Sequence, residues 1–496
     1  MKQISQTAFY TDYRHAYFLH AYTLIFAILS AWISLSPGIR CYYIPAFGIW
    51  LACIKSCPVE KQIYYVYLYY SLFITFASYW IVFCLESFMS FSFPISWTLG
   101  LLAFSFVAFI HSIPLLLCIR YLGLQHFPLI LTCSEYIRQP FFWAIPWSWQ
   151  AYAVMDMPLL TQLLPLGGQY LAGYIVCLLS LCFAHSILKN SMRPLLYIVG
   201  IYICLGIWSL ISLNRSIPTQ AIQVNLLQGN VATIDKLQPQ KSWNKYRLLL
   251  EKTDNTTLNI LPEGILYHRA DEKSLQQLQQ HQLLKNSFIG TSLKYDDFSP
   301  ALVGTGKAHG TYHKQILVPF GEFIPLVDFL PSTLWHILPD LPHDVAHSNK
   351  DLLSFSNHVI YPMICYELFF PPIDKHWLSR SSFLIVSGEN TWYNNSIINQ
   401  QFILSARMRA LENAKPLLLA LNRGPSTMID AKGKILDGLP YDSDGILSLS
   451  FTPEIQFTVY QNVPDFVILL ILIIMHCAAT LGYRYERTAR LFTSTS

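Results

Sequence analysis

Three polar side chains in the second half of the chain have the types needed for covalent attack on a carbonyl group. Glu263, Lys314 and Cys365 each stand at or beside the end of an apolar run typical of a buried strand. A thiol must lose its proton before it attacks, and a nearby carboxylate can accept that proton. A lysine ammonium stabilises the thiolate and then the oxyanion. We therefore interpret them as a candidate base, cation and nucleophile.

Cys365 is distinguished by its isolation. The chain has eleven cysteines, and only Cys365 lies in the polar region from about residue 215 to 460. Without a disulfide partner in that region, the thiol is either an inert core residue or a nucleophile. Taken singly, Cys365 reads better as a core residue, and Glu263 and Lys314 read better as surface residues. Their combination favours the catalytic interpretation.

The composition is that of a membrane protein with one large water-facing part. The chain is 53% hydrophobic and only 12% charged, whereas soluble domains carry about 25% charged residues. Its net charge of +4 is too small to indicate a nucleic-acid partner. Zinc-type cysteine or histidine spacing and Gly-rich phosphate loops are absent from the sequence, so we expect no metal and no cofactor.

About eight apolar stretches approach the roughly 20 residues that a membrane helix needs. They cover residues 17–35, 41–54, 63–86, 97–118, 127–147, 168–187, 194–213 and 464–482. Basic residues gather in alternate loops, which predicts that those loops are cytoplasmic and that the large region after the seventh stretch is extracytoplasmic. We expect a seven-helix membrane domain over 1–214, a water-facing domain over 215–460, and a final helix with its tail over 461–496.

Strand and helix patterns alternate in the water-facing region. Strands are predicted at 221–227, 258–261, 287–294, within 310–318, before Cys365, and at 383–387 and 417–421, with helices at 242–253, 273–286 and 396–414 and a hairpin at 426–437. This alternation predicts an α/β domain. In such folds, sites collect at the carboxyl ends of strands.

Two features of the fifth apolar stretch need an explanation. Glu135 and Arg138 lie three residues apart, and charges at that depth are costly unless they are paired or face water. They form either an ion pair at a helix end or a contact with a lipid headgroup or a catalytic domain resting on the membrane. Residues 141–149 contain three tryptophans and Pro146, which indicates an interfacial belt or a re-entrant edge.

Several short strings carry recognisable motifs. They are Leu261-Pro262-Glu263, the segment Tyr312–Leu326, Ile364-Cys365-Tyr366-Glu367, Leu227-Gln228-Gly229-Asn230, Ala406–Glu412, and Glu135–Arg138 followed by Ile145-Pro146-Trp147. Together they resemble the motifs of the apolipoprotein N-acyltransferases, which are membrane-embedded members of the nitrilase (carbon–nitrogen hydrolase) superfamily. The resemblance covers nearly the whole chain. It implies a multi-pass α-helical membrane domain with an extracytoplasmic nitrilase-like α-β-β-α sandwich, in the bacterial inner (cytoplasmic) membrane with the sandwich on its periplasmic face.

The resemblance also implies a reaction. Cys365 would take a fatty acyl chain from a phospholipid as a thioester, and the α-amino group of a diacylglyceryl-cysteine on an apolipoprotein would then receive it. Glu263 would be the proton acceptor, and Lys314 with the N–H of Tyr366 would hold the oxyanion. The membrane itself is the third partner, and no nucleic acid is involved.

Further residues match family positions around the pocket. They are Glu322, Glu367 and Trp392, together with Glu135 and Arg138 in the membrane arm. Two loops depart from the family pattern: residues 387–392 carry an extra acid, and residues 422–424 read Asn-Arg-Gly. Two alternatives therefore stay open, namely a nitrilase-fold membrane protein of the conjugal-transfer type with another substrate, and a non-catalytic membrane assembly factor.

Overall fold

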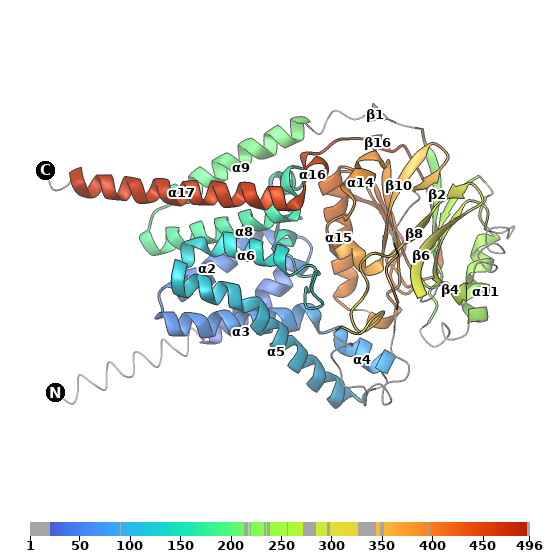
Figure 1. Cartoon of the computed structure of the whole chain (residues 1–496), viewed down its shortest axis with the longest axis horizontal. Coiled ribbons are helices and arrows are strands. Elements are labelled where there is room, and N and C mark those ends of the chain that lie inside the picture. The colour runs from blue at the N-terminus through green and yellow to red at the C-terminus, as the bar shows by residue number, and fades with distance from the viewer. Residues whose placement is uncertain are drawn as a thin grey trace.

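A helical part and a two-sheet part make up the molecule, and both are seen in Figure 1. This computed structural model describes residues 20–89, 91–212, 217–218, 220–232, 235, 239–254, 256–270, 284–294, 298–325, 344–347, 352–394 and 396–493. The N-terminal helices and the last helix lie together on one side, and the sheets lie on the other (Figure 1). The order of elements confirms the predicted change from membrane-type helices to an α/β fold and back.

Apolar helices of uneven length make up the helical part. They are His20–Leu35, α2 (Tyr43–Lys55), α3 (Val59–Ser78), α4 (Ile81–Met89), α5 (Phe93–Leu117), α6 (Phe127–Ile137), α7 (Pro158–Thr161), α8 (Leu164–Lys189), α9 (Arg193–Ser212), α16 (Val459–Asn462) and α17 (Asp465–Thr493), with short turns η1 (Arg40–Tyr42), η2 (Cys118–Leu122), η3 (Leu124–His126) and η4 (Gln150–Val154). Among the described residues, Phe93–Leu122 and Leu164–Lys189 are long and apolar enough to cross a membrane. A third span results if α3 and Ile81–Ser87, bent by 49°, count as one.

Local breaks explain why the apolar stretches do not all become long helices. The third stretch bends between α3 and α4. The fifth gives α6, which has only 11 residues. Pro140 follows Gln139, and a residue before proline disfavours the helical conformation. The chain then passes through turns to η4, with Ile145 at a φ of 46°. The tryptophans and proline predicted an interfacial belt or a re-entrant edge here, and the structure has an irregular segment between α6 and η4.

Two mixed seven-stranded sheets form the α/β part. One has the order β14-β13-β12-β11-β10-β9-β7, and the other has the order β15-β2-β3-β5-β6-β8 with β4 beside β5. The strands are β2 (Ile222–Gln228), β3 (Leu258–Ile260), β4 (Leu266–Ala270), β5 (Ser287–Lys294), β6 (Phe298–Thr305), β7 (Ala308–His309), β8 (Thr311–His313), β9 (Leu353–Phe355), β10 (His358–Ile364), β11 (Phe383–Gly388), β12 (Leu417–Leu421), β13 (Thr427–Ile429), β14 (Ile435–Gly438) and β15 (Gly445–Phe451). A separate pair joins β1 (Ile217–Pro218) to β16 (Glu454–Ile455).

Helices cover both outer faces of the paired sheets (Figure 1). Helix α15 (Ile398–Asn413) and the short α14 (Lys375–Arg380) lie on the side of the membrane helices, and α11 (Pro239–Leu250) lies on the far side. Strands β10, β11 and β12 run parallel, with Ile364 opposite Ser387 near their carboxyl ends. They are buried on both faces, as expected for parallel strands covered by layers. The polar helix predicted at 273–286 falls almost entirely outside the described residues.

A fully buried ion pair joins the sheet part to the helical part. On α15, Arg409 Nη1 and Glu412 Oε2 are 2.5 Å apart, and both side chains are completely inaccessible to solvent. Arg409 Nη2 donates to Gln169 Oε1 at 2.6 Å, and Gln169 N–H donates to Glu412 Oε1 at 2.8 Å. Gln169 lies just after the kink at Gly167 and Gly168 in α8. The pair therefore fixes α15 on a membrane helix.

Replacing Glu412 by alanine should destabilise the whole molecule, because the Arg409 charge would stay buried without its anion. We expect a loss of about 3 kcal/mol, seen as a lower midpoint of thermal unfolding of the detergent-solubilised protein. Glu251→Ala is the matched control, since the Arg247–Glu251 pair is equally short at 2.5 Å but its side chains are 42% and 41% exposed. That variant should lose about 0.5 kcal/mol or less. Equal shifts in the two variants would contradict the assignment.

Candidate active site

The carboxyl ends of three strands bring Glu263, Lys314 and Cys365 to one centre. Glu263 follows β3, Lys314 follows β8, and Cys365 follows β10. Lys314 Nζ donates to Glu263 Oε1 at 3.1 Å. Both residues are near enough to Cys365 for their charges to act on the pKa of its thiol. The centre thus lies between the ends of the two sheets, because β3 and β8 belong to one and β10 to the other.

Cys365 begins the short 3-10 helix η7 (Cys365–Phe369), which we call the Cys365 turn. Its φ of 47° is in the left-handed region, which residues other than glycine seldom adopt. The thiol donates to the carbonyl oxygen of Glu389 at 3.5 Å. A sharp turn between a buried strand and a helix is a way to project a side chain from the end of a sheet.

The carboxylate of Glu367 fixes the distance between the Cys365 turn and the loop that carries Lys314. Its Oε2 accepts from the Ile364 N–H at 2.7 Å. Its Oε1 accepts from the Gln315 N–H at 2.6 Å and from the Tyr312 hydroxyl at 2.9 Å. Glu367 is itself buried. A single carboxylate therefore ties β10 to the end of β8.

Glu322 is the second anion beside Lys314. Its Oε1 accepts from Lys314 Nζ at 2.5 Å, and its Oε2 accepts from the Val318 N–H at 2.7 Å. The Lys314 side chain is completely buried. Burial alone would lower the pKa of Lys314, but Glu263 and Glu322 hold that pKa well above its usual value, so the ammonium stays charged. Burial also raises the pKa of Glu322, against the opposing effect of Lys314.

The thiol of Cys365 keeps its proton at rest. Its side chain is 4% exposed. Burial, followed by the negative charge of Glu263, raises the pKa of Cys365 well above its usual value, and the positive charge of Lys314 acts in the opposite direction. Attack by this sulfur therefore needs a base that takes the proton at the moment of reaction. Glu263 has the right position for that role.

Tyr366 and Trp392 face the junction with the helical part. The ring of Tyr366 lies 6.3 Å from that of Trp147 and 5.0 Å from that of Phe370, between centroids. Trp392 belongs to η8 (Thr391–Tyr393), and its carbonyl oxygen accepts from the Cys84 thiol in α4 at 3.8 Å. The loop after β11 therefore touches a membrane helix.

Glu135 and Arg138 lie apart from the Cys365 centre and form a buried ion pair with a separation of 3.8 Å. Glu135 Oε1 accepts from the Gln150 N–H at 3.1 Å, and Arg138 Nη1 donates to His111 Nδ1 at 3.1 Å. Of the two alternatives raised by the sequence, the internal ion pair is the one present in the structure. The pair supports the chain segment that follows α6.

A largely apolar groove of about 930 Å³ opens next to the centre. Its walls come from the turn after α6, the loop after β8, the loop after the Cys365 turn, and the start of α17. Phe141, Phe323, Tyr366, Phe370 and Phe466 supply aromatic surface to it. Phe466 is 59% exposed at the start of the apolar helix α17. The groove thus runs from the exposed apolar start of α17 to Tyr366, the residue that follows Cys365.

Two residues at the centre were missed by reasoning from the sequence. A Cβ atom on Gly290 of β5 would lie 2.5 Å from the Cα of Glu263, so only glycine lets the Glu263 backbone sit there. Tyr393 also interacts with the centre: burial and then the charge of Cys365 raise the pKa of its hydroxyl. In the sequence, only its position next to Trp392 could have pointed to Tyr393. Among the described residues, no group of three or more His, Cys, Asp or Glu side chains is placed to hold a metal ion.

Comparison with known proteins gives two family matches. The model of the apolipoprotein N-acyltransferase N-terminal domain matches residues 17–182. The carbon–nitrogen hydrolase model matches residues 301–460. The first match covers most of the membrane helices, and the second covers the strands that carry Lys314 and Cys365.

Curated relatives extend the similarity over most of the chain. The apolipoprotein N-acyltransferase of Pseudomonas aeruginosa (strain LESB58) is 28% identical over 424 residues, which is 77% of this chain and 81% of that protein. That of Azotobacter vinelandii is 27% identical over 441 residues, 83% of this chain and 84% of that protein. Over most of its length, the chain is similar to apolipoprotein N-acyltransferases. The solved structure of Saccharomyces cerevisiae Nit3, a nitrilase-superfamily protein, is 17% identical over 48% of this chain and 92% of that chain, with a TM-score of 0.35.

The electrostatics of the centre predict opposite effects of two charge-removing variants on the thiol. Lys314→Met should raise the pKa of Cys365, and Glu263→Gln should lower it, because Lys314 opposes and Glu263 adds to the upward shift. The pH at which alkylation of Cys365 by iodoacetamide reaches half of its plateau rate should therefore rise in the first variant and fall in the second. Peptide mass spectrometry with a pH series measures the rates.

Lys307→Met removes the same charge from an exposed turn and serves as the control. It should leave the alkylation rate of Cys365 unchanged at every pH. A higher half-plateau pH in Glu263→Gln than in the wild type would contradict the assigned charge arrangement.

Proposed function

We propose that this protein transfers a fatty acyl chain from a phospholipid to the α-amino group of the N-terminal diacylglyceryl-cysteine of apolipoproteins, through a thioester on Cys365. The observation that carries the proposal is the buried Lys314, held between Glu263 and Glu322 beside a protonated thiol at the junction with the membrane helices. Similarity to apolipoprotein N-acyltransferases over most of the chain supports the choice of substrates.

In the first half-reaction, Glu263 takes the thiol proton as the Cys365 sulfur attacks the ester carbonyl carbon of the phospholipid. Negative charge develops on the carbonyl oxygen, and Lys314 with the Tyr366 N–H stabilises it. The carbon–oxygen bond to the glycerol then breaks. The leaving lysophospholipid oxygen takes the proton from Glu263, which leaves an acyl thioester on Cys365.

In the second half-reaction, the amine of the acceptor attacks the thioester carbonyl carbon, and Glu263 removes a proton from the nitrogen. The same oxyanion donors act again. The carbon–sulfur bond breaks, and the sulfur recovers its proton from Glu263. Glu322 keeps Lys314 in place in both steps, and Glu367 keeps Lys314 and Cys365 at a fixed spacing.

Both substrates are lipids, which accounts for the position of the centre. A nucleophile that accepts acyl chains from a bilayer must lie at its surface, and the groove between α6, α17 and the Cys365 turn offers an apolar route there. Trp392 lies in a loop in contact with α4 and would line the substrate pocket. Glu135 and Arg138 would act indirectly, by holding the segment after α6.

The membrane arrangement forms part of the proposal. About eight spans would cross the bacterial inner membrane, with a membrane domain over 1–214, a catalytic domain over 215–460 on the periplasmic face, and a final helix and cytoplasmic tail over 461–496. The alternation of basic loops supports this orientation. Apolar helices shorter than 18 residues, such as His20–Leu35 and Asp465–Leu481, would supply spans beyond the long ones.

The test is the intact mass of the purified protein after incubation with a phospholipid of defined acyl chains. We expect a gain of one acyl group that hydroxylamine removes, because a thioester is the proposed intermediate. Cys365→Ala should show no gain. Cys477→Ala, which removes an exposed thiol from α17, should acylate like the wild type.

Three results would contradict the proposal. An acyl adduct that persists in Cys365→Ala would mean that another residue of the protein carries the acyl group. A folded wild type without any adduct would favour the non-catalytic alternative. A thioester that forms but is not passed to diacylglyceryl peptide would favour a relative with another acceptor.

A further inference from the structure

The segment 143–150, which we call the tryptophan segment, is anchored at both ends within the helical part. His111 Nε2 donates to the carbonyl oxygen of Trp143 at 2.7 Å. At the other end, the Tyr43 hydroxyl donates to Gln150 Oε1 at 2.5 Å. Glu135 accepts from the Gln150 N–H, as described above. The segment is therefore held rigidly although it has little regular structure.

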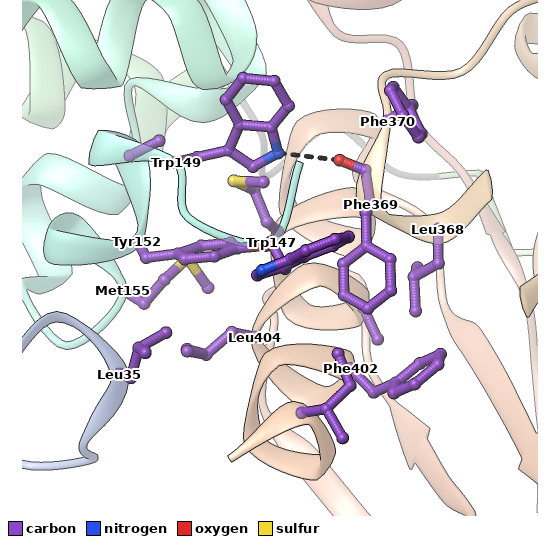
Figure 2. Close-up of a cluster of buried hydrophobic side chains, with 14 of the residues drawn as sticks. Leu35, Trp147, Trp149, Tyr152, Met155, Leu368, Phe369, Phe370, Phe402 and Leu404 are labelled. Carbon is purple, nitrogen blue, oxygen red and sulfur yellow. Dashed lines mark hydrogen bonds between the residues drawn. The ribbon is translucent and has the colours of Figure 1, made fainter. Parts of the chain in front are cut away.

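The tryptophan segment reaches across to the Cys365 turn. The indole N–H of Trp149 donates to the carbonyl oxygen of Phe369 at 2.8 Å, and Figure 2 shows this bond crossing between the two parts. Phe369 is the last residue of η7. Carbonyl groups at the end of a helix lack partners within the helix, so an outside donor there fixes the position of the terminus. Trp149 is 1% exposed, which keeps water from replacing that donor.

A charged group fixes the indole ring in turn. The Arg138 guanidinium carbon lies 5.2 Å from the centroid of the Trp149 ring, within the range of a cation–π contact. Arg138 is oriented by Glu135 and His111. The buried ion pair of α6 thus acts on the Cys365 turn through one tryptophan.

We propose that Trp149 is a positioning residue for Cys365, holding the carboxyl end of the Cys365 turn so that the sulfur points at its base. The inference rests on the proposed role of Cys365 as nucleophile. Cys365 has a backbone conformation that its neighbours must maintain, with φ at 47°. Glu367 holds the amino end of the turn through the Ile364 N–H, and Trp149 holds its carboxyl end through Phe369.

Trp149→Phe tests the role, because it keeps an aromatic ring and removes the donor. We expect alkylation of Cys365 to slow about tenfold, and kcat for acyl transfer to fall by a similar factor, since small displacements of a nucleophile cost this much or more. The KM for phospholipid should stay unchanged, as Trp149 touches no part of the groove. The pH at which the alkylation rate levels off should shift as well, because the sulfur moves relative to Glu263 and Lys314.

Ser78→Ala is the matched control. The indole N–H of Trp147 donates to Ser78 Oγ at 2.9 Å, so this variant removes a bond between the tryptophan segment and α3 and leaves the rings of Trp147 and Trp149 in place. It should retain the wild-type alkylation rate, even if its thermal stability falls.

Two outcomes would overturn the inference. One is equal slowing of alkylation in Trp149→Phe and Ser78→Ala, which would mean that the segment acts only by general packing. The other is a Trp149→Phe protein of lower thermal stability whose alkylation rate and kcat are unchanged. Alkylation needs no lipid, so this readout tests the positioning role even if acyl transfer itself were disproved.

Discussion

The buried ammonium of Lys314 is the charge around which the centre is built. An unpaired cation removed from water would cost several kcal/mol, and the two carboxylates of Glu263 and Glu322 offset that cost. Burial and then the charge of Glu263 raise the pKa of Cys365 against the effect of Lys314, which keeps the thiol proton in place at rest. The same lysine would then offer positive charge where an oxyanion would form. The position of Lys314 therefore limits where Glu263, the thiol and the carbonyl group of a substrate can lie.

Polar and apolar contacts hold the helical part and the two sheets in one arrangement. Buried polar contacts cross the junction at several places, among them the Arg409–Glu412 pair against Gln169 and the Trp149 indole against Phe369. Figure 2 shows that the second contact is surrounded by apolar side chains from both parts, including Tyr152, Met155, Phe402 and Leu404. A junction of this kind favours one arrangement of the catalytic residues relative to the membrane. That constraint suits substrates that arrive laterally from a bilayer.

The sequence predicted the strand ends better than it predicted the membrane helices. The run before Cys365 is apolar at nearly every position, which is typical of a strand buried on both faces, and it forms the buried strand β10. The helix at 127–147 failed after Ile137, because Pro140 and Pro146 interrupt it and the following chain finds its hydrogen bonds in Glu135 and His111. Those partners are distant or irregular in sequence, so periodicity does not reveal them.

Contacts between residues far apart in the sequence explain why the roles of Glu367 and Gly290 in the site could not be predicted. The sequence placed Glu367 around the pocket by its match to a family position, whereas its function of tying β10 to the loop after β8 depends on Gln315 and Tyr312, more than 50 positions away. Gly290 carried no motif, and its need for a bare Cα arises from the backbone of Glu263, in the segment that follows the adjacent strand β3. Local chemistry suggested the candidates, and packing decided how they are held.

The central claim is that one thiol carries the acyl group between two lipids. The most direct measurement is a single-turnover transfer: wild type is loaded from isotope-labelled phospholipid, freed of lipid, and mixed with a diacylglyceryl-cysteine peptide. The account predicts that label leaves Cys365 and appears on the α-amino group of the peptide at matching rates, and that a peptide with an acetylated amine receives none. Loss of label to water at the same rate with or without the peptide would contradict it.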